Sequence, residues 1–164
     1  MAAVALDEAV RRLLPADAAD SLALKWPNDL LLAGAKLSGI LLERADGWVV
    51  VGLGVNVADH PALPDRVTTS LSEAGADIDA ATLILSLADC FAAWLARWRH
   101  DGIAPVVARW CERAHPPGTP LVARLPDGSE AHGGFDRLDA TGALVLRLAD
   151  GAVRVIHAGD VFLV

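Results

Sequence analysis

The sequence predicts an α+β fold, in which a mixed sheet with helices is followed by a small all-β module. Up to residue 115, stretches with helical spacing of apolar residues lie on either side of a strand-rich region. Beyond the sequence His115-Pro-Pro-Gly118 the apolar period changes to two, and short apolar runs alternate with glycine-containing turns. We therefore divide the chain into residues 1–115 and residues 116–164.

The first unit is expected to begin with a helix over residues 2–14, which Pro15 ends, followed by an acidic, alanine-rich loop. Asn28 and Asp29 are placed in a turn after Pro27, although that tripeptide alone is equally typical of any turn. Asp46-Gly47 is a hairpin turn. Four strands are expected around these turns, over residues 22–26, 30–32, 36–43 and 48–57.

Two amphipathic helices follow a loop over residues 58–70, in which His60 is expected to be solvated. The longer helix covers residues 78–99 with Asp79 as its N-cap, and the shorter one covers residues 105–113. The tryptophans of the longer helix are expected to lie in the core. The cysteines, Cys90 and Cys111, have no metal-ligand spacing and are interpreted as small core residues without a disulfide.

The second unit shows five short segments with strand periodicity separated by turns such as Asp127-Gly128 and Asp150-Gly151. Five strands in so short a stretch predict a small SH3-like β-barrel. Gly133-Gly134 indicates a bulge or bend within the second of them. The strands are expected over residues 119–125, 130–138, 143–148, 153–157 and 161–164.

Composition argues against several functional classes. The 164 residues carry a formal charge of −7, which is a poor match to nucleic acid. No apolar run reaches the roughly 18 residues of a membrane span, and the first ten residues contain Asp7 and Glu8 but no basic residue, unlike a signal peptide. We therefore expect a cytoplasmic protein. The apolar fraction of 54% exceeds the roughly 45–50% of an average domain.

The chain contains two lysines, Lys25 and Lys36, while its other twelve cationic side chains are arginines. Lysine presents a compact point charge on a flexible stem, whereas guanidinium is a wide planar fork. A site that places a charge against a phosphate or carboxylate oxygen favours lysine, although codon drift would give the same bias. Gly39, which follows Lys36 within the same expected strand, indicates close approach of a ligand or backbone.

Three motifs together resemble those of biotin protein ligases, in the order and close to the spacing of that family. They are Lys25-Trp-Pro-Asn-Asp29, Lys36-Leu-Ser-Gly-Ile-Leu-Leu-Glu43 and Val51-Gly-Leu-Gly-Val-Asn-Val57. The likeness extends to the C-terminus, where Gly134-Phe-Asp136 and His157-Ala-Gly-Asp160 match landmarks of the family's SH3-like domain.

The resemblance implies part of a class II synthetase-like, biotin ligase-like catalytic domain over residues 1–115 and an SH3-like domain over residues 116–164. It implies that ATP and Mg²⁺ are used to convert biotin into biotinyl-5′-adenylate. The biotinyl group then passes to a lysine of the biotin carboxyl carrier protein of acetyl-CoA carboxylase. No nucleic acid or membrane is implied as a partner.

The resemblance also assigns site residues. Lys36 matches the essential catalytic lysine, whose ammonium lies against the biotin carboxylate and the α-phosphate; one such donor is worth roughly 3–4 kcal/mol in the transition state. Asn28 and Asn56, with Asp29, match residues near the nucleotide and Mg²⁺, and Lys25 is assigned to the nucleotide side. Asn28 and Asp29 are the candidate Mg²⁺ ligands. The implied biotin-binding residues are Lys36, Gly39, Ile40, Leu41, Gly52, Leu53 and Gly54.

One departure from the family pattern concerns the missing motifs. The family's Gly-Arg-Gly-Arg-type loop and its Ser-Thr-containing strand, which precede the matched motifs, do not occur in this sequence. About half of the family's catalytic domain is therefore unmatched, either because the gene model is truncated or because the chain is a true fragment. We expect the isolated chain to be unstable or self-associating through an exposed sheet, and weakly active or inactive.

Three functional hypotheses follow. The first is a biotin protein ligase. The second is a non-catalytic fragment that docks a carrier protein or partner chain. The third is a relative that ligates lipoate or octanoate, against which the Lys36-Leu-Ser-Gly39 strand and the Gly52-Leu-Gly54 segment favour biotin. A DNA-binding repressor role has no support, since no helix-turn-helix domain is present in this sequence.

Overall fold

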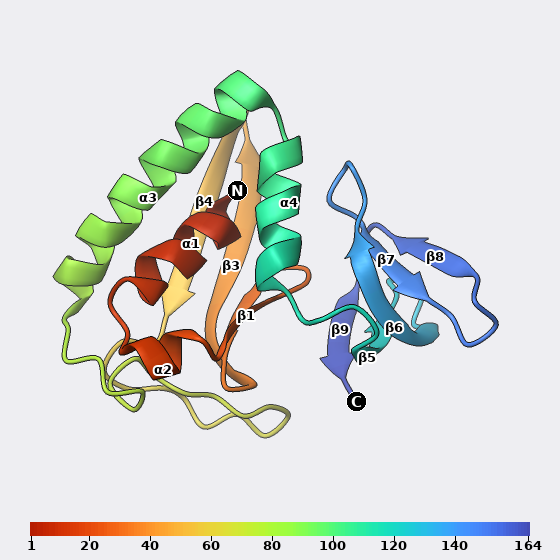
Figure 1. Cartoon of the computed structure of the whole chain (residues 1–164), viewed down its shortest axis with the longest axis horizontal. Helices are drawn as coiled ribbons and strands as arrows, with labels where there is room; N and C mark the ends of the chain where they lie inside the picture. The colour runs from red at the N-terminus through yellow and green to blue at the C-terminus, as the bar shows by residue number, and fades with distance from the viewer.

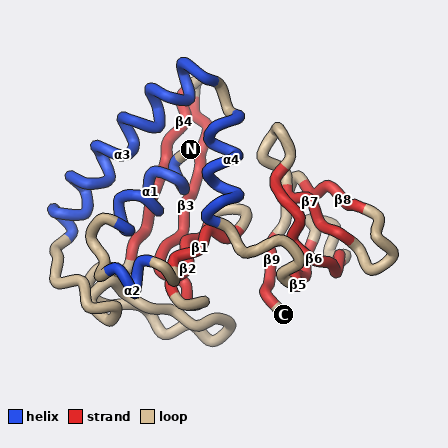
Figure 2. The backbone as a smooth tube through the Cα atoms, in the orientation of Figure 1, coloured by secondary structure: helices blue, strands red, loops and turns tan.

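The structure, a computed structural model, describes residues 1–164 and consists of two units that pack side by side (Figure 1). In the first unit, helices cover one face of a four-stranded sheet. In the second, five short strands form a separate sheet that ends at the C-terminus. A long loop joins the first sheet to the longest helix (Figure 2). The predicted α+β class is confirmed.

The first sheet has the order β1-β2-β3-β4 and contains the four expected strands. Its ladders are antiparallel, and parallel pairing is limited to the isolated bridges Leu24–Ala114 and Lys36–Thr68, so the sheet is less mixed than expected. Short hairpins explain this, because a parallel pair needs a long crossover. The strands are β1 (Leu22–Lys25), β2 (Asp29–Leu32), β3 (Ala35–Ala45) and β4 (Trp48–Val55).

Asp29 was expected in a turn, but it is the first residue of β2. It pairs with Lys25 on β1 and with Gly39 on β3, which leaves the turn to residues 26–28. The ladder on both sides fixes the backbone of Asp29. Its carboxylate is therefore held by the sheet and does not depend on a loop tip.

The outer half of the β3–β4 hairpin carries a group of exposed apolar side chains. Its large apolar side chains are all more than half exposed: Leu41, Leu42, Trp48, Val49 and Val50. Apolar residues of this size normally lie inside a protein, and a contiguous exposed group is unusual for a monomer. The sequence-based expectation that strands of this sheet are uncovered is confirmed for this hairpin.

Helix α1 (Ala2–Arg11) is sandwiched between the sheet and two further helices, α3 (Ala80–Asp101) and α4 (Ala104–Arg113). Its apolar face, including Val4, Leu6 and Val10, is fully buried. It ends earlier than the expected residue 14, and the expected loop contains a one-turn helix, α2 (Ala16–Ala19). Pro15 separates the two helices, since its ring cannot continue α1 but can precede a new helical turn.

Helix α3 begins as predicted at Asp79, whose carboxylate accepts a hydrogen bond of 2.8 Å from the backbone N–H of Thr82. It ends at Gly102, which adopts a φ of 75°. Cys90 and Trp94 are buried as expected, but Trp98 is 44% exposed. By length and composition α3 could cross a membrane, although core helices pass the same test and α3 packs along α1.

The second sheet has the order β8-β7-β6-β5-β9, with all neighbours antiparallel. No ladder joins β8 to β9, so hydrogen bonds do not close the expected barrel. Gly133 is required because a Cβ there would lie 2.6 Å from the carbonyl oxygen of Arg147, whereas the register shift falls later, between Phe135 and Arg137. The strands are β5 (Pro120–Arg124), β6 (Glu130–Leu138), β7 (Leu144–Arg147), β8 (Val153–Ile156) and β9 (Asp160–Leu163).

The two units are joined by direct contacts. The indole Nε1 of Trp26 donates a hydrogen bond of 3.2 Å to the carbonyl oxygen of Gly142. Trp110 of α4 packs against Phe135 of β6 with ring centroids 6.2 Å apart. Cys90 and Cys111 are both free, as expected. The second unit thereby lies beside the end of the first sheet that carries the charged residues described next.

Candidate active site

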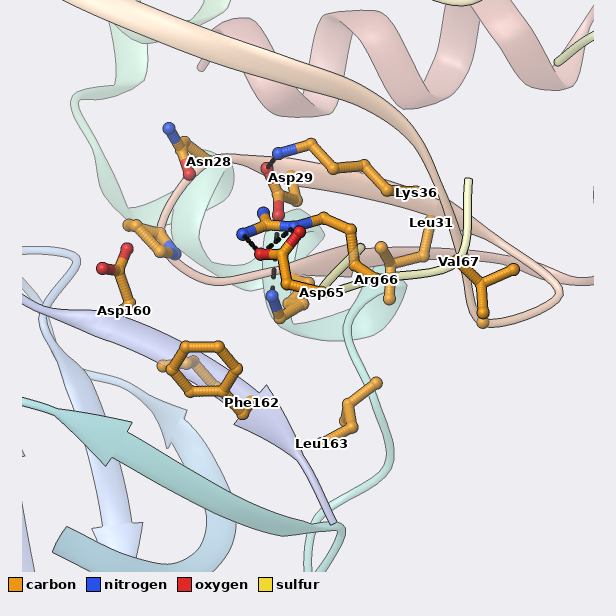
Figure 3. A pocket seen from close by; sticks show the side chains of 14 residues that line it. Asn28, Asp29, Leu31, Lys36, Asp65, Arg66, Val67, Asp160, Phe162 and Leu163 are labelled. Atoms are coloured by element: carbon orange, nitrogen blue, oxygen red, sulfur yellow. Dashed lines mark hydrogen bonds and ion pairs between the residues drawn. The ribbon is translucent and has the colours of Figure 1, made fainter. Parts of the chain in front are cut away.

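Both lysines of the chain converge on one carboxylate. The Nζ atom of Lys36 lies 2.6 Å from Oδ1 of Asp29, and that of Lys25 lies 3.5 Å from Oδ2 (Figure 3). Asp29 is buried, whereas the side chain of Lys36 is 26% exposed, so its ammonium is accessible to a ligand. Burial lowers the pKa of Lys25, and the charge of Asp29 opposes this effect. We refer to these three residues as the charged centre.

A shallow groove lined largely by glycines leads away from the charged centre along β3 and β4. Gly39 pairs with Gly54, and Leu41 pairs with Gly52, so all four residues share one face of the sheet. These residues line an open depression on that face. A Cβ on Gly39 would lie 3.3 Å from Nζ of Lys36, which shows that the groove begins directly at the ammonium.

Ile40 and Leu53 alternate with the groove residues and face the helices. Ile40 is buried in the core, and Leu53 packs against it. Both border the groove through their backbone atoms. Any role of these two residues in ligand binding is therefore a role of the main chain.

Asn28 and Asn56 use their amide groups to hold the backbone around the charged centre. The Nδ2 atom of Asn28 donates a hydrogen bond of 2.7 Å to the carbonyl of Ile40. That of Asn56 donates to the carbonyl of Thr69 at 2.9 Å and more weakly to that of Lys36 at 3.4 Å. The structure therefore gives both residues a positioning role, and their assignment to the nucleotide remains a prediction.

A deeper cavity of about 380 Å³ lies on the other side of the charged centre (Figure 3). One wall is the sheet with Lys25, Asp29 and Lys36, and the opposite wall is β9 of the second unit. The loop over residues 58–70 covers part of the opening. The lining residues that the sequence analysis did not assign to a site include Asp65, Arg66 and Val67 of this loop and Asp160, Phe162 and Leu163 of β9.

The loop is fixed to β3 by its backbone. The N–H of Lys36 donates to the carbonyl of Val67 at 2.9 Å, and the N–H of Thr69 donates to the carbonyl of Lys36 at 3.1 Å. His60 was expected to be solvated, but its Nδ1 lies 2.7 Å from the hydroxyl of Thr68 and its Nε2 lies 3.1 Å from a carboxylate oxygen of Glu73. His60 therefore braces the loop, a role that no local sequence signal indicated.

The residues present do not fit a protein-held Mg²⁺ ion. No group of three His, Cys, Asp or Glu side chains converges anywhere in the chain. The oxygens of Asp29 face the two ammonium groups, which compete directly with a cation. Asn28 and Asp29 thus do not form a metal site by themselves.

Comparison with known protein families matches both units. The sequence profile of the biotin/lipoate A/B protein ligase family matches residues 1–112, and that of the biotin protein ligase C-terminal domain matches residues 121–164. Among solved structures, the biotin protein ligase of Aquifex aeolicus in complex with biotin and ATP superposes with a TM-score of 0.81. It is 20% identical in sequence, and the match covers 99% of this chain and 71% of that one. This likeness concerns the fold.

Two curated relatives give closer sequence matches. A biotin–[acetyl-CoA-carboxylase] ligase of Paracoccus denitrificans is 40% identical over 99% of this chain and 70% of its own length. A protein of the same name from Mycobacterium tuberculosis is 36% identical over 84% of this chain, which spans about half (52%) of that relative. With two profile matches and this degree of identity, the chain belongs to the biotin/lipoate A/B protein ligase family.

Proposed function

We propose that this protein ligates biotin to a lysine of the biotin carboxyl carrier protein of acetyl-CoA carboxylase, through biotinyl-5′-adenylate formed from ATP. The observation that carries the proposal is the position of Lys36, whose ammonium lies where the glycine groove meets the cavity. Relatives named as biotin ligases, and a structural neighbour solved with biotin and ATP, support the choice of substrates.

The groove suits biotin because it is lined largely by glycines and apolar residues. Gly39, Gly52 and Gly54 leave room for the fused rings, and Leu41 offers apolar contact. The carboxylate at the end of the valeryl chain would then reach Lys36. The cavity beyond Lys36 is polar, and the cationic side chains of Lys25 and Arg66 also line it, which suits the phosphates of ATP.

In the first step, a carboxylate oxygen of biotin attacks the α-phosphorus of ATP. An acyl–phosphate bond forms, the bond between the α-phosphorus and the bridging oxygen breaks, and pyrophosphate leaves with the electron pair. The ammonium of Lys36, held in place by Asp29, stabilises the negative charge that develops on the phosphoryl oxygens. Lys25 keeps the buried carboxylate of Asp29 paired while Lys36 turns toward the substrate.

In the second step, the neutral amine of the carrier lysine attacks the acyl carbon of the adenylate. The amide bond forms, the acyl–phosphate bond breaks, AMP leaves with the electron pair, and the nitrogen loses one proton to water. The protein needs no nucleophile of its own, because the attacking groups belong to the two substrates. The proposal places the reaction in the cytoplasm, where ATP and the carboxylase carrier are found.

We also propose that the isolated chain turns over slowly. The groove is open, and Leu41 at its side is 62% exposed, so water reaches the reacting groups from this face. Water weakens electrostatic stabilisation, because a site open to water has a higher effective dielectric constant than a closed site. The exposed hairpin around Val49 supports the related proposal that the chain associates with itself.

Isothermal titration with biotinyl-5′-adenylate tests the proposed function. We expect the wild-type chain to bind, and Lys36→Ala to weaken binding roughly ten- to a hundredfold, because a hydrogen bond from a charged group is lost. Arg44→Ala is the matched control, since Arg44 lies on the same strand and is exposed outside the site. Equal affinities of wild type and Lys36→Ala would refute the proposed site. Biotin-dependent pyrophosphate release separates a ligase from a non-catalytic binding fragment.

Lipoate is the alternative substrate that the family name raises. Its five-membered disulfide ring lacks the ureido group of biotin. Competition titration with lipoate should leave adenylate binding unchanged, and displacement at similar concentrations by lipoate would reassign the substrate.

A further inference from the structure

Arg66 is a cation at the cavity that neither the fold nor the proposed role of Lys36 explains. It follows Asp65 at the tip of the loop that lies over the charged centre (Figure 3). Its guanidinium donates to the carboxylate of Asp65 through Nε at 3.0 Å and also through Nη2. Both side chains remain about half exposed, 41% for Arg66 and 54% for Asp65. An exposed pair between adjacent residues adds little to folding stability.

The backbone nevertheless holds Arg66 in a defined place. The next residue, Val67, accepts the hydrogen bond from the N–H of Lys36, so Arg66 is tied to the strand that carries the catalytic lysine. Asn56 fixes the same segment through the carbonyl of Thr69. These backbone hydrogen bonds therefore hold Arg66 beside the charged centre, and its position does not depend on the ion pair with Asp65.

The carboxylates around Arg66 also stabilise a cation at this position. The hydrogen bond to Asp65 raises the pKa of Arg66 most, and the charges of Asp65, Asp29 and Asp160 add to this effect. Asp160 comes from β9 of the second unit, so the guanidinium lies between the two walls of the cavity. Without a ligand, the three cations of the cavity are balanced by three carboxylates.

ATP would upset this balance, since it carries about four negative charges. At the charged centre, Lys25 and Lys36 share Asp29, which leaves one net positive charge for the whole triphosphate. A planar guanidinium fits two phosphate oxygens at once, and phosphate is a stronger partner than a solvent-exposed carboxylate. The group placed to supply the missing charge is Arg66.

We infer that Arg66 binds the β- and γ-phosphates of ATP in the proposed reaction and that Asp65 is the partner it leaves when ATP enters. The inference rests on the proposed function, which assigns ATP to this cavity. Arg66 would hold the pyrophosphate part of the nucleotide while the bond to the α-phosphorus breaks. When pyrophosphate departs, the guanidinium returns to Asp65.

The test compares nucleotides that differ in the phosphates Arg66 would contact. Titration of the full chain with ATP, AMP and biotinyl-5′-adenylate is repeated for Arg66→Ala, Arg66→Lys and the control Arg44→Ala. We expect Arg66→Ala to weaken ATP binding roughly ten- to a hundredfold, with Arg66→Lys in between, because a hydrogen bond to a charged group is lost. AMP and biotinyl-5′-adenylate, which have no β- or γ-phosphate, should bind Arg66→Ala within twofold of wild type.

A second variant should change the affinity for ATP in the opposite direction. Asp65→Asn removes the competing carboxylate, so ATP should bind more tightly than to wild type, by several-fold, while AMP should not. Equal losses for ATP and AMP in Arg66→Ala would reduce Arg66 to a structural residue and overturn the inference. So would wild-type affinity of Arg66→Ala for ATP, or a failure of the wild-type chain to bind ATP at all.

The proposed function is refuted by a different result from the one that refutes the role of Arg66. If Arg66 does not contact the phosphates, biotinyl-5′-adenylate still binds, and its binding still depends on Lys36. If the wild-type chain binds neither the adenylate nor ATP, the proposed function and the inference fall together. Thermal unfolding of each variant confirms that the fold persists, as expected for an exposed loop residue.

Discussion

Gly39→Ala is the most informative single substitution at the site, because its structural effect is confined to Lys36. The φ angle of Gly39 lies outside the left-handed region, so alanine introduces no backbone strain. Its Cβ would lie 3.3 Å from Nζ and 3.4 Å from Cε of Lys36, and 3.6 Å from Oδ1 of Asp29. The first two contacts are too close, so the flexible lysine must move by a few tenths of an ångström.

The magnitude follows from Coulomb's law. If the ammonium moves from about 3 Å to about 3.5 Å from a unit charge on the ligand, the attraction falls by about 0.8 kcal/mol at an effective dielectric constant of about 20. This corresponds to about a fourfold loss of affinity. The added methyl group also occupies part of the groove, which weakens ligand binding further.

Gly54→Ala is the matched control. Gly54 pairs with Gly39 on the same face, but a Cβ there meets nothing closer than the carbonyl oxygen of Gly39 at 3.9 Å. It fills the same groove without touching Lys36. We therefore expect Gly39→Ala to bind biotinyl-5′-adenylate about fourfold more weakly than Gly54→Ala, in titrations of the two variants side by side.

An independent assay reports on the lysine itself. Because the chain has two lysines, selective ¹³C labelling of lysine gives two Cε signals. Gly39→Ala should shift the Lys36 signal, and Gly54→Ala should leave it in place. Equal affinities of the two variants together with an unshifted Lys36 signal would refute the argument that Gly39 makes room for the ammonium.

Three further outcomes test the fold around the site. Asp7 is fully buried and pairs with Arg11 at 3.0 Å and Arg113 at 3.5 Å, so Asp7→Ala leaves two arginines unpaired. Urea unfolding should show a loss of about 3–5 kcal/mol, and a loss below about 1 kcal/mol would contradict the pairing. Burial lowers the pKa of His115 below the ordinary value of 6.5, so the unfolded chain takes up the proton first as the pH falls. The free energy of unfolding should therefore decrease as the pH drops below about 6.5, with a shallower decrease in His115→Gln; identical pH slopes would exclude this origin. Finally, sedimentation velocity should show self-association that rises with concentration and is reduced by Val49→Lys, and a concentration-independent monomer would remove the exposed hairpin as its cause.

The local sequence was sufficient for most of the secondary structure. Helix α3 was predicted from its apolar spacing and from Asp79 as its cap, and both are present. The hairpin of β3 and β4 was predicted from Asp46-Gly47. These signals are read within a few residues, because caps, turns and apolar periods act on neighbouring backbone groups.

Predictions at element ends were less accurate for the same reason. Asp29 has the sequence character of a turn residue, yet pairing with β3 draws it into the sheet. Trp98 has the spacing of a core residue, yet it is 44% exposed in the folded protein. In both cases a partner distant in the sequence decides the outcome, and local propensity does not include that partner.

Local sequence patterns were enough to predict most of the secondary structure, the family resemblance and the three motifs that contribute Lys25, Asp29, Lys36 and the groove glycines. The tertiary structure alone decided that Lys25 and Lys36 share Asp29, that Asn56 fixes the loop, and that Arg66 faces Asp160 across the cavity. The physical reason is the separation along the chain over which each kind of interaction acts. Periodicity and turn chemistry act between near neighbours, whereas charges from β2, the loop and β9 interact only after packing of the two units has brought them within a few ångströms of each other.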